Sequence, residues 1–262
     1  MWLTHRHSAN YTLISTNRKP GGGSSAAMSR RVLWIDISRT IALLGMIIFH
    51  FVRDLEFFAI IETGMTTQGT WTIFARLVAC AFLFISGMSF VVAHQSGFRP
   101  QPWARRLLIV GSSAAIVTLA TFIAVPDQFI YFGILHAIAV ASVIGVAALA
   151  VPASGLLLLA AFAVVADGLM PSGVFSSPML AWTGLSSAHR PSLDFIPLVP
   201  WVSAFLAGMA FAKFVPITRF DIPMKPGRLA NALAWPGRHS LAIYLLHQPI
   251  LLTVIWLALA IV

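Results

Sequence analysis

The stretch from Trp34 to Leu55 reads W-I-D-I-S-R-T-I-A-L-L-G-M-I-I-F-H-F-V-R-D-L, and it is apolar enough to cross a bilayer. It nevertheless contains Asp36, Arg39, His50 and Asp54. At about 100° per residue, these four side chains fall within a narrow arc of one helical face. Charged groups inside a spanning helix are costly, so they normally face a protein interior or a wet cavity. The stripe therefore predicts where the chemistry of this chain lies.

The composition is that of an integral membrane protein. Of its 262 residues, 58% are hydrophobic and 10% are charged, whereas about a quarter of a soluble globular chain is charged. The single cysteine, Cys80, excludes an internal disulfide and a cysteine-based metal cluster. The net charge of +9 comes from residues that flank apolar runs, so membrane orientation explains it better than nucleic-acid binding does.

Seven apolar runs predict an all-α, polytopic integral membrane protein with about seven transmembrane helices in a single domain over residues 32–262. Residues 1–31 are polar and basic, and we expect a disordered cytoplasmic lead in which Met28 is an alternative start. Prolines punctuate residues 171–196, which predicts a loop with a short interfacial helix. The predicted spans are 32–52, 72–94, 106–125, 130–150, 154–170, 197–215 and 240–261.

The basic residues predict the orientation of these spans. In a seven-helix arrangement, 13 of the 17 basic residues fall on one side. The positive-inside rule then places the N-terminus in the cytoplasm and the C-terminus outside. The 13 residues are Arg6, Arg18, Lys19, Arg30, Arg31, Arg99, Arg105, Arg106, Lys213, Arg219, Lys225, Arg228 and Arg238.

In this orientation, His50 lies near the outer end of the first span and Arg39 lies toward the cytoplasm. They are eleven residues apart, which is roughly 16 Å along a helix axis, so they serve different ends of one cavity. Asp54 follows His50 by one turn and could orient its imidazole. Asp36 precedes Arg39 by one turn, and we favour a structural ion pair between them.

Further candidates occur near the same membrane level as His50. Each has a plainer reading, since a neutral histidine can simply bond to a neighbouring helix and a tryptophan can anchor at the interface. No spacing of histidines within one helix suggests a metal site, so none is predicted. The candidates are Arg76, His136, Asp194, Trp201, Tyr244 and His247.

Several segments resemble landmarks of a known family. They are residues 39–55, F-L-F-I-S-G-M-S at 82–89, F-G-I-L-H at 132–136, D-F-I-P-L-V-P-W at 194–201 and S-L-A-I-Y-L-L-H-Q-P at 240–249. Together they resemble bacterial membrane proteins grouped with the heparan-α-glucosaminide N-acetyltransferase catalytic domain. The spacing of Arg39 and His50 also resembles the first helix of membrane O-acyltransferases that modify bacterial surface polysaccharides.

The resemblance implies transmembrane acyl transfer, in which cytosolic acetyl-CoA donates an acyl group to an amine or hydroxyl of a sugar on the other side. We expect His50 to act as general base or as an acylated relay, with Asp54 as its orienter. Arg39 is expected to hold CoA phosphates. Acceptor binding is assigned to His136, Asp194, Trp201 and His247.

The expected partners are the lipid bilayer, acyl-CoA and a sugar or glycan acceptor, without nucleic acid and with homo-oligomer formation left open. Two alternatives remain at this point. The same His and Asp residues could line the cavity of a transporter for a small solute or proton. They could also join helices in a non-catalytic membrane subunit.

Overall fold

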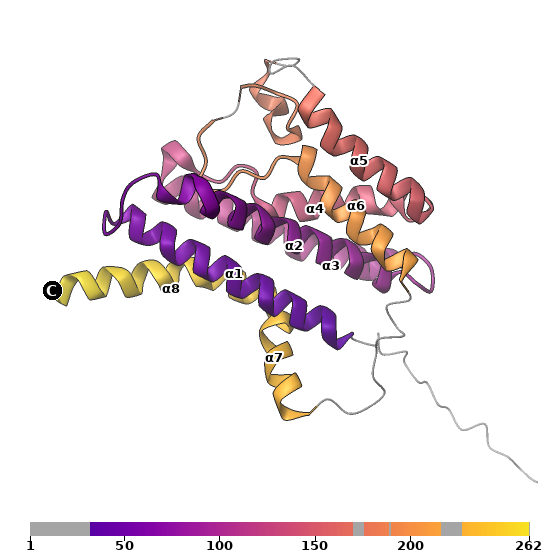
Figure 1. Cartoon of the computed structure of the whole chain (residues 1–262), viewed down its shortest axis with the longest axis horizontal. Helices are drawn as coiled ribbons and strands as arrows, with labels where there is room; N and C mark the ends of the chain where they lie inside the picture. Colours follow the sequence, from indigo (N-terminus) through magenta and orange to yellow (C-terminus); the bar gives the residue numbers. More distant parts are fainter. Residues whose placement is uncertain (1–31, 170–175, 189, 216–226, 262) are drawn as a thin grey trace, which may run out of the picture. The chain divides into compact units, whose positions relative to one another are not determined.

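The computed structural model describes residues 32–169, 176–188, 190–215 and 227–261, and in these residues it is helical without a β-strand (Figure 1). The predicted lead at 1–31 lies outside the described residues. Three short 3-10 turns, η1 (Met65–Thr67), η2 (Pro126–Gln128) and η3 (Pro178–Thr183), lie in the connections. The helices are α1 (Leu33–Phe57), α2 (Gly69–Ala93), α3 (Pro100–Ala124), α4 (Ile134–Ala148), α5 (Ala153–Leu169), α6 (Leu198–Phe214), α7 (Arg228–Arg238) and α8 (Ser240–Ile261).

The predicted all-helical membrane fold is confirmed, while the number of spans is confirmed only in part. By length and composition, α1, α2, α3 and α8 could each cross a membrane. The other three apolar helices, α4, α5 and α6, have 15, 17 and 17 residues. At about 1.5 Å per residue they extend roughly 22–26 Å, less than the ~30 Å hydrocarbon core. Seven spans, and the orientation of the termini, therefore stay predictions.

Helices α2 and α6 pack closely because each presents a glycine to the backbone of the other. A Cβ at Gly87 would overlap the carbonyl oxygen of Phe205, and a Cβ at Gly208 would overlap that of Phe84. Small residues allow this approach, and close packing largely drives helix association within a membrane. The contact surrounds the fully buried side chains of Leu83 and Phe205, so it forms the centre of the core.

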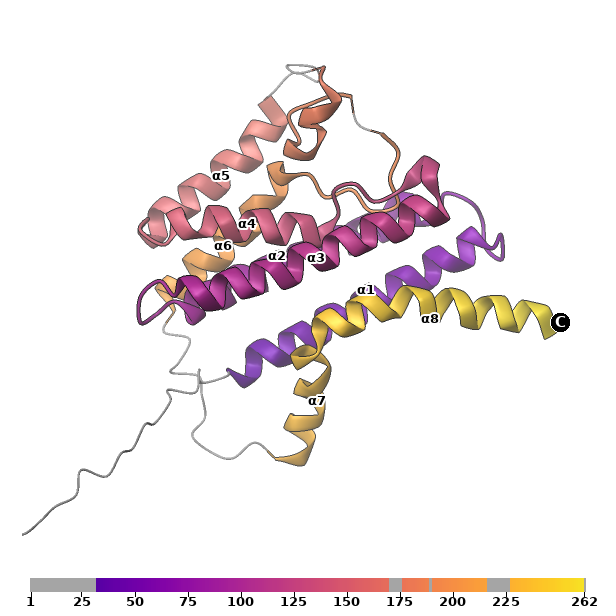
Figure 2. The same ribbon diagram turned by 180° about the vertical axis from the view of Figure 1, so that it is seen from behind.

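Helix α7 is not predicted from the sequence, and it packs against the first half of α1 in both views (Figures 1 and 2). The Thr40 hydroxyl donates to the Leu233 carbonyl at 2.7 Å and accepts from the Gly237 amide at 2.9 Å. Asp36 lies beneath this contact, paired with Arg39 at 3.0 Å and with Arg238 at 3.4 Å. The predicted ion pair between Asp36 and Arg39 is thus confirmed.

The segments that precede α4 and α6 are joined by backbone hydrogen bonds. The amide of Leu193 donates to Gln128 at 2.8 Å, and the amide of Ile196 donates to Phe132 at 3.0 Å. Phe132 and Phe195 form an isolated parallel bridge between the two segments. This pairing fixes the loop between Leu193 and Ile196, and with it the position of Asp194.

Candidate active site

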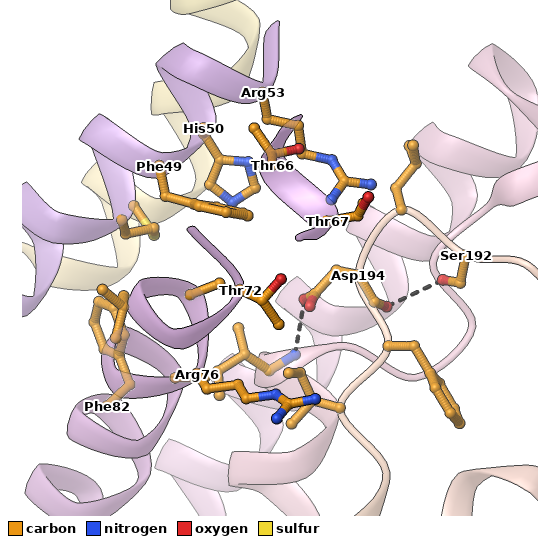
Figure 3. Close-up of a pocket in the computed structure, with 18 of the residues that line it drawn as sticks. Phe49, His50, Arg53, Thr66, Thr67, Thr72, Arg76, Phe82, Ser192 and Asp194 are labelled. Atoms are coloured by element: carbon orange, nitrogen blue, oxygen red, sulfur yellow. Dashed lines mark hydrogen bonds between the residues drawn. The ribbon is translucent and has the colours of Figure 1, made fainter. Parts of the chain in front are cut away.

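A cavity of about 400 Å³ lies where α1, α2, α6 and α8 meet the loop that carries Asp194 (Figure 3). This volume falls within the range of pockets that bind small molecules. Apolar side chains, such as those of Met46, Phe49 and Phe82, supply much of its wall. Its polar lining consists of His50, Arg53, Thr66, Thr67, Thr72, Arg76, Ser192, Asp194, Trp201 and Tyr244.

His50 extends from α1 into this pocket and is backed by a second histidine on α8. The rings of His50 and His247 lie 4.9 Å apart, edge to face. His247 Nδ1 lies 2.6 Å from the Tyr244 carbonyl oxygen. Because a carbonyl only accepts, Nδ1 carries the hydrogen there and Nε2 is left with a lone pair. His247 Nε2 is buried without a hydrogen-bond partner among the described residues, and the His247 ring packs against that of His50.

Asp54 faces α8 and bonds to an amide there. The Gln248 side-chain nitrogen donates to Asp54 Oδ1 at 2.6 Å. Asp54 is buried, and no hydrogen bond joins it to His50 within the described part of the chain. The hypothesis that Asp54 orients the His50 imidazole therefore has no contact to support it. Its observed contact is between two helices.

Asp194 lies in the pocket at the beginning of α4. Its Oδ2 accepts the Ile134 amide hydrogen at 3.1 Å, which places a carboxylate where a helix favours negative charge. Gly133 makes the approach possible, because a Cβ there would lie 2.5 Å from Asp194 Oδ2. Burial raises the pKa of the Asp194 carboxyl above its ordinary value, although the Ile134 bond and the Arg53 charge act in the opposite direction.

Two arginines enter the same pocket. Arg53 follows His50 by three residues on α1, and Arg76 follows Thr72 by four on α2. Figure 3 shows the Arg53 guanidinium pointing toward Thr67 and Asp194, with Arg76 on the other side of Asp194 in this view. The Thr72 hydroxyl is buried and has no partner among the described residues. It is thus a polar atom available to a ligand.

The rim of the pocket is held by Glu56 at the end of α1. Its carboxylate accepts the Gly64 amide at 2.6 Å and the Thr66 amide at 2.9 Å. The Thr66 hydroxyl also donates to it at 2.5 Å. These bonds fold the connection between α1 and α2 back over α1, so Thr66 and Thr67 reach the pocket.

The structure brings together some of the predicted site residues and separates others. His50, Asp194 and Trp201 line the pocket, and His247 contacts His50. Arg53 is not predicted from the sequence. The available signal was its position three residues after His50, on the same helical face and on the side where the positive-inside rule disfavours arginine.

His136 forms a hydrogen bond with the backbone at the start of its own helix, α4. Its Nδ1 accepts from the Gly133 amide at 3.2 Å, so its Nε2 carries the hydrogen and donates to the Thr118 hydroxyl at 3.2 Å. Thr118 in turn donates to the Ile130 carbonyl at 2.7 Å. The predicted role of His136 in acceptor binding therefore finds no support, because its ring is not among the groups that line the pocket.

Arg39 lies toward the other end of α1 and does not line this pocket. Its guanidinium donates to Asp36 and, at 2.6 Å, to the Ser89 hydroxyl on α2. Arg39 therefore joins α1 to α2 in the state described. Among the described residues, no group of three or more His, Cys, Asp or Glu side chains could hold a metal ion.

The fold and the pocket define an all-helical membrane protein with a polar site built on its first helix. A sequence model of the family described as heparan-alpha-glucosaminide N-acetyltransferase, catalytic, matches residues 31–249. The chain belongs to this family, and the match includes every residue that lines the pocket. Membership indicates a membrane acetyltransferase. No curated protein and no solved structure gives a significant match.

Proposed function

We propose that this protein transfers an acetyl group from acyl-CoA to an amino or hydroxyl group of an extracytoplasmic sugar, across the bacterial inner membrane. The family match supports acetyl transfer. The observation that carries the proposal is that His50, a group suited to proton transfer, lines a pocket of ligand size together with the half-buried carboxylate of Asp194.

In the direct route, the acceptor nitrogen or oxygen attacks the carbonyl carbon of the thioester. A carbon–nitrogen or carbon–oxygen bond forms, and the carbon–sulfur bond breaks. His50 accepts the proton that the acceptor loses and returns it to the departing CoA thiolate. In the covalent route, a nitrogen of His50 attacks the thioester, the carbon–sulfur bond breaks, and CoA leaves as the thiol with the proton that the imidazole releases. The acceptor then attacks the acetyl group, the bond between that group and His50 breaks, and the acceptor's proton passes to the freed imidazole. Both routes require His50.

The other pocket groups suit a sugar. The Asp194 carboxylate can accept a hydrogen bond from an amino or hydroxyl group of the acceptor and hold it near His50. Trp201 and Tyr244 present large, partly exposed rings to the same space, and such rings combine apolar contact with a polar tip. Together these groups would orient the acceptor for attack.

The donor is assigned to the cytoplasmic side of the same helix. Arg39 lies roughly 16 Å along α1 from His50, and its guanidinium fork suits a phosphate group. An extended acyl-CoA with its phosphates near Arg39 would then direct its thioester toward His50. In this proposal, phosphate binding competes with the contacts that Arg39 makes to Asp36 and Ser89.

The test is acetyl transfer by purified, detergent-solubilised protein from radiolabelled acetyl-CoA to a pool of glucosamine-type acceptors, with release of free CoA measured in parallel. His50→Ala should lower the rate about 100-fold or more, as expected for loss of a general base. His94→Gln is the matched control, because His94 lies at the end of α2 against Phe90 and Phe98, outside the pocket lining.

Label retained on the wild-type protein, and absent from His50→Ala, would favour the covalent route over the direct one. Full activity in a well-folded His50→Ala protein would remove His50 from the mechanism. A folded wild-type protein that releases no CoA and labels no acceptor would contradict the acyltransferase proposal itself.

A further inference from the structure

The charged side chains that line the pocket do not neutralise one another. Arg53, Arg76 and Asp194 give two positive charges and one negative charge. Asp194 is already bonded to the Ile134 amide. Arg53 is close enough to act on Asp194 electrostatically, but no ion pair or hydrogen bond holds Arg53 or Arg76 within the described part of the chain.

Membrane orientation does not account for these two arginines. Of the four basic residues that the positive-inside pattern leaves over, Arg39 is paired with Asp36 and Arg190 is an exposed loop residue. Arg53 and Arg76 are the other two, and both lie on helices long enough to span the membrane. Arg53 also acts electrostatically on Asp54 and Glu56, and Arg76 is exposed, but no ion pair holds either guanidinium among the described residues. Charged side chains on such helices usually mark a functional site.

The two guanidinium groups line the same pocket, together with hydroxyl groups that can also donate hydrogen bonds. Figure 3 shows Arg53 and Arg76 on opposite sides of the pocket centre, with the Thr66, Thr67 and Thr72 side chains around them. A guanidinium presents several N–H groups in a fixed fork that matches the oxygens of a carboxylate, phosphate or sulfate. The Thr72 hydroxyl, which has no partner among the described residues, can add one more hydrogen bond.

We propose that Arg53 and Arg76 bind an acid group carried by the acceptor sugar, so that the preferred acceptor is an anionic sugar and not a neutral one. This inference rests on the proposed function, since it names the acceptor class of the same pocket. The acid group would bind the guanidinium forks of Arg53 and Arg76, while the reacting amino or hydroxyl group faces His50 and Asp194.

The phosphates of acyl-CoA carry the same chemistry and are the other possible source of the anion. The geometry favours the acceptor for two reasons. Arg53 lies within one turn of His50, where the acetyl group and the acceptor meet, and the phosphates are remote from the thioester. The predicted orientation also places Arg53 and Arg76 toward the outside, opposite the cytosolic donor.

The test compares glucosamine with glucosamine 6-phosphate as acceptors, using wild type, Arg53→Gln, Arg76→Gln and the double variant. Wild type should use the phosphorylated sugar with a kcat/KM at least about tenfold higher, as one charge-assisted contact would give. Each single variant should lose most of this preference, and the KM for acetyl-CoA should stay unchanged. Arg190→Gln, an exposed arginine outside the pocket lining, is the control.

A binding measurement keeps the inference testable without turnover. Glucosamine 6-phosphate should raise the melting temperature of wild type and of His50→Ala, and not that of the double arginine variant. Absence of turnover with every acceptor would contradict the proposed function, while this binding result would still decide the anion site.

Three results would overturn the inference. One is an equal kcat/KM for the two sugars in wild type. Another is a higher KM for acetyl-CoA in the arginine variants with both sugars, which would assign the anion to the donor. The third is stabilisation of the double variant by the phosphorylated sugar to the same extent as wild type.

Discussion

At the scale of single residues, Asp194 is the group whose ionisation should influence the stability of the protein. An unfolded aspartate has a pKa of about 3.9, and burial raises the pKa of Asp194 in the folded state. Between these two values the folded protein holds more protons than the unfolded chain. Stability therefore falls as the pH rises through this window.

Asp194→Asn should remove this dependence, because the amide oxygen can still accept the Ile134 hydrogen and the side chain no longer ionises. The melting temperature of wild type minus that of Asp194→Asn should decrease as the pH rises from about 4, and it should level off above the folded pKa. A difference that stays constant across this range would show that the Asp194 carboxyl does not titrate as described.

Asp54 should contribute mainly to stability, through its bond to Gln248. Asp54→Ala leaves the half-buried Gln248 amide without its partner, so it should lower the free energy of unfolding by about 1–3 kcal/mol. In a double-mutant cycle with Gln248→Ala, the two effects should be strongly non-additive. Additive losses would show that this bond does not couple the two residues. Loss of acetyl transfer in a fully stable Asp54→Ala protein would favour a direct role of Asp54 beside His50.

At the scale of helices, the contact between α2 and α6 holds the walls of the pocket. Thr72 and Arg76 come from α2 and Trp201 comes from α6, so their separation depends on how closely these helices approach. Gly87→Ala places a methyl group against the Phe205 carbonyl, and overpacking of this kind typically costs about 1–3 kcal/mol.

Gly111→Ala on α3 is the matched control, because a Cβ at Gly111 meets no atom within 4 Å. Thermal unfolding should show a clearly lower melting temperature for Gly87→Ala and little change for Gly111→Ala. Equal melting temperatures for the two variants would mean that α2 and α6 do not need this close approach.

The apolar helices were predictable from the sequence because a membrane demands long apolar runs. The predicted span 72–94 matches α2, and 240–261 matches α8. Helix α7 was missed because it contains no long apolar run. It is amphipathic, so its apolar residues are interspersed with polar ones at the helical period.

The pocket was predictable only in part. The spans and the charge pattern predict one membrane level for His50 and Asp194, and both residues line the pocket. The bond between Asp54 and Gln248 depends on which helices become neighbours, and these residues are 194 positions apart. The contacts of His136 could not be predicted from its level alone, because its partners are the backbone of its own helix start and a hydroxyl on α3.

At the scale of the whole molecule, the predicted topology places the C-terminus outside, with seven spans. Alkaline phosphatase, which is active only outside the cytoplasm, should therefore be active when fused after Val262. The same enzyme fused after Arg238 should be inactive, because the positive-inside rule places that segment in the cytoplasm. Activity at Arg238, or its absence at Val262, would require an even number of spans or the opposite orientation.

The most direct measurement places the donor and the acceptor on opposite sides of a membrane. Proteoliposomes that enclose radiolabelled acetyl-CoA are supplied with glucosamine and glucosamine 6-phosphate outside. Labelled sugar should accumulate outside with wild type and with His94→Gln, and not with His50→Ala. Equal transfer by a folded His50→Ala protein, or labelling that occurs only when donor and acceptor share one side, would contradict transmembrane acetyl transfer at His50.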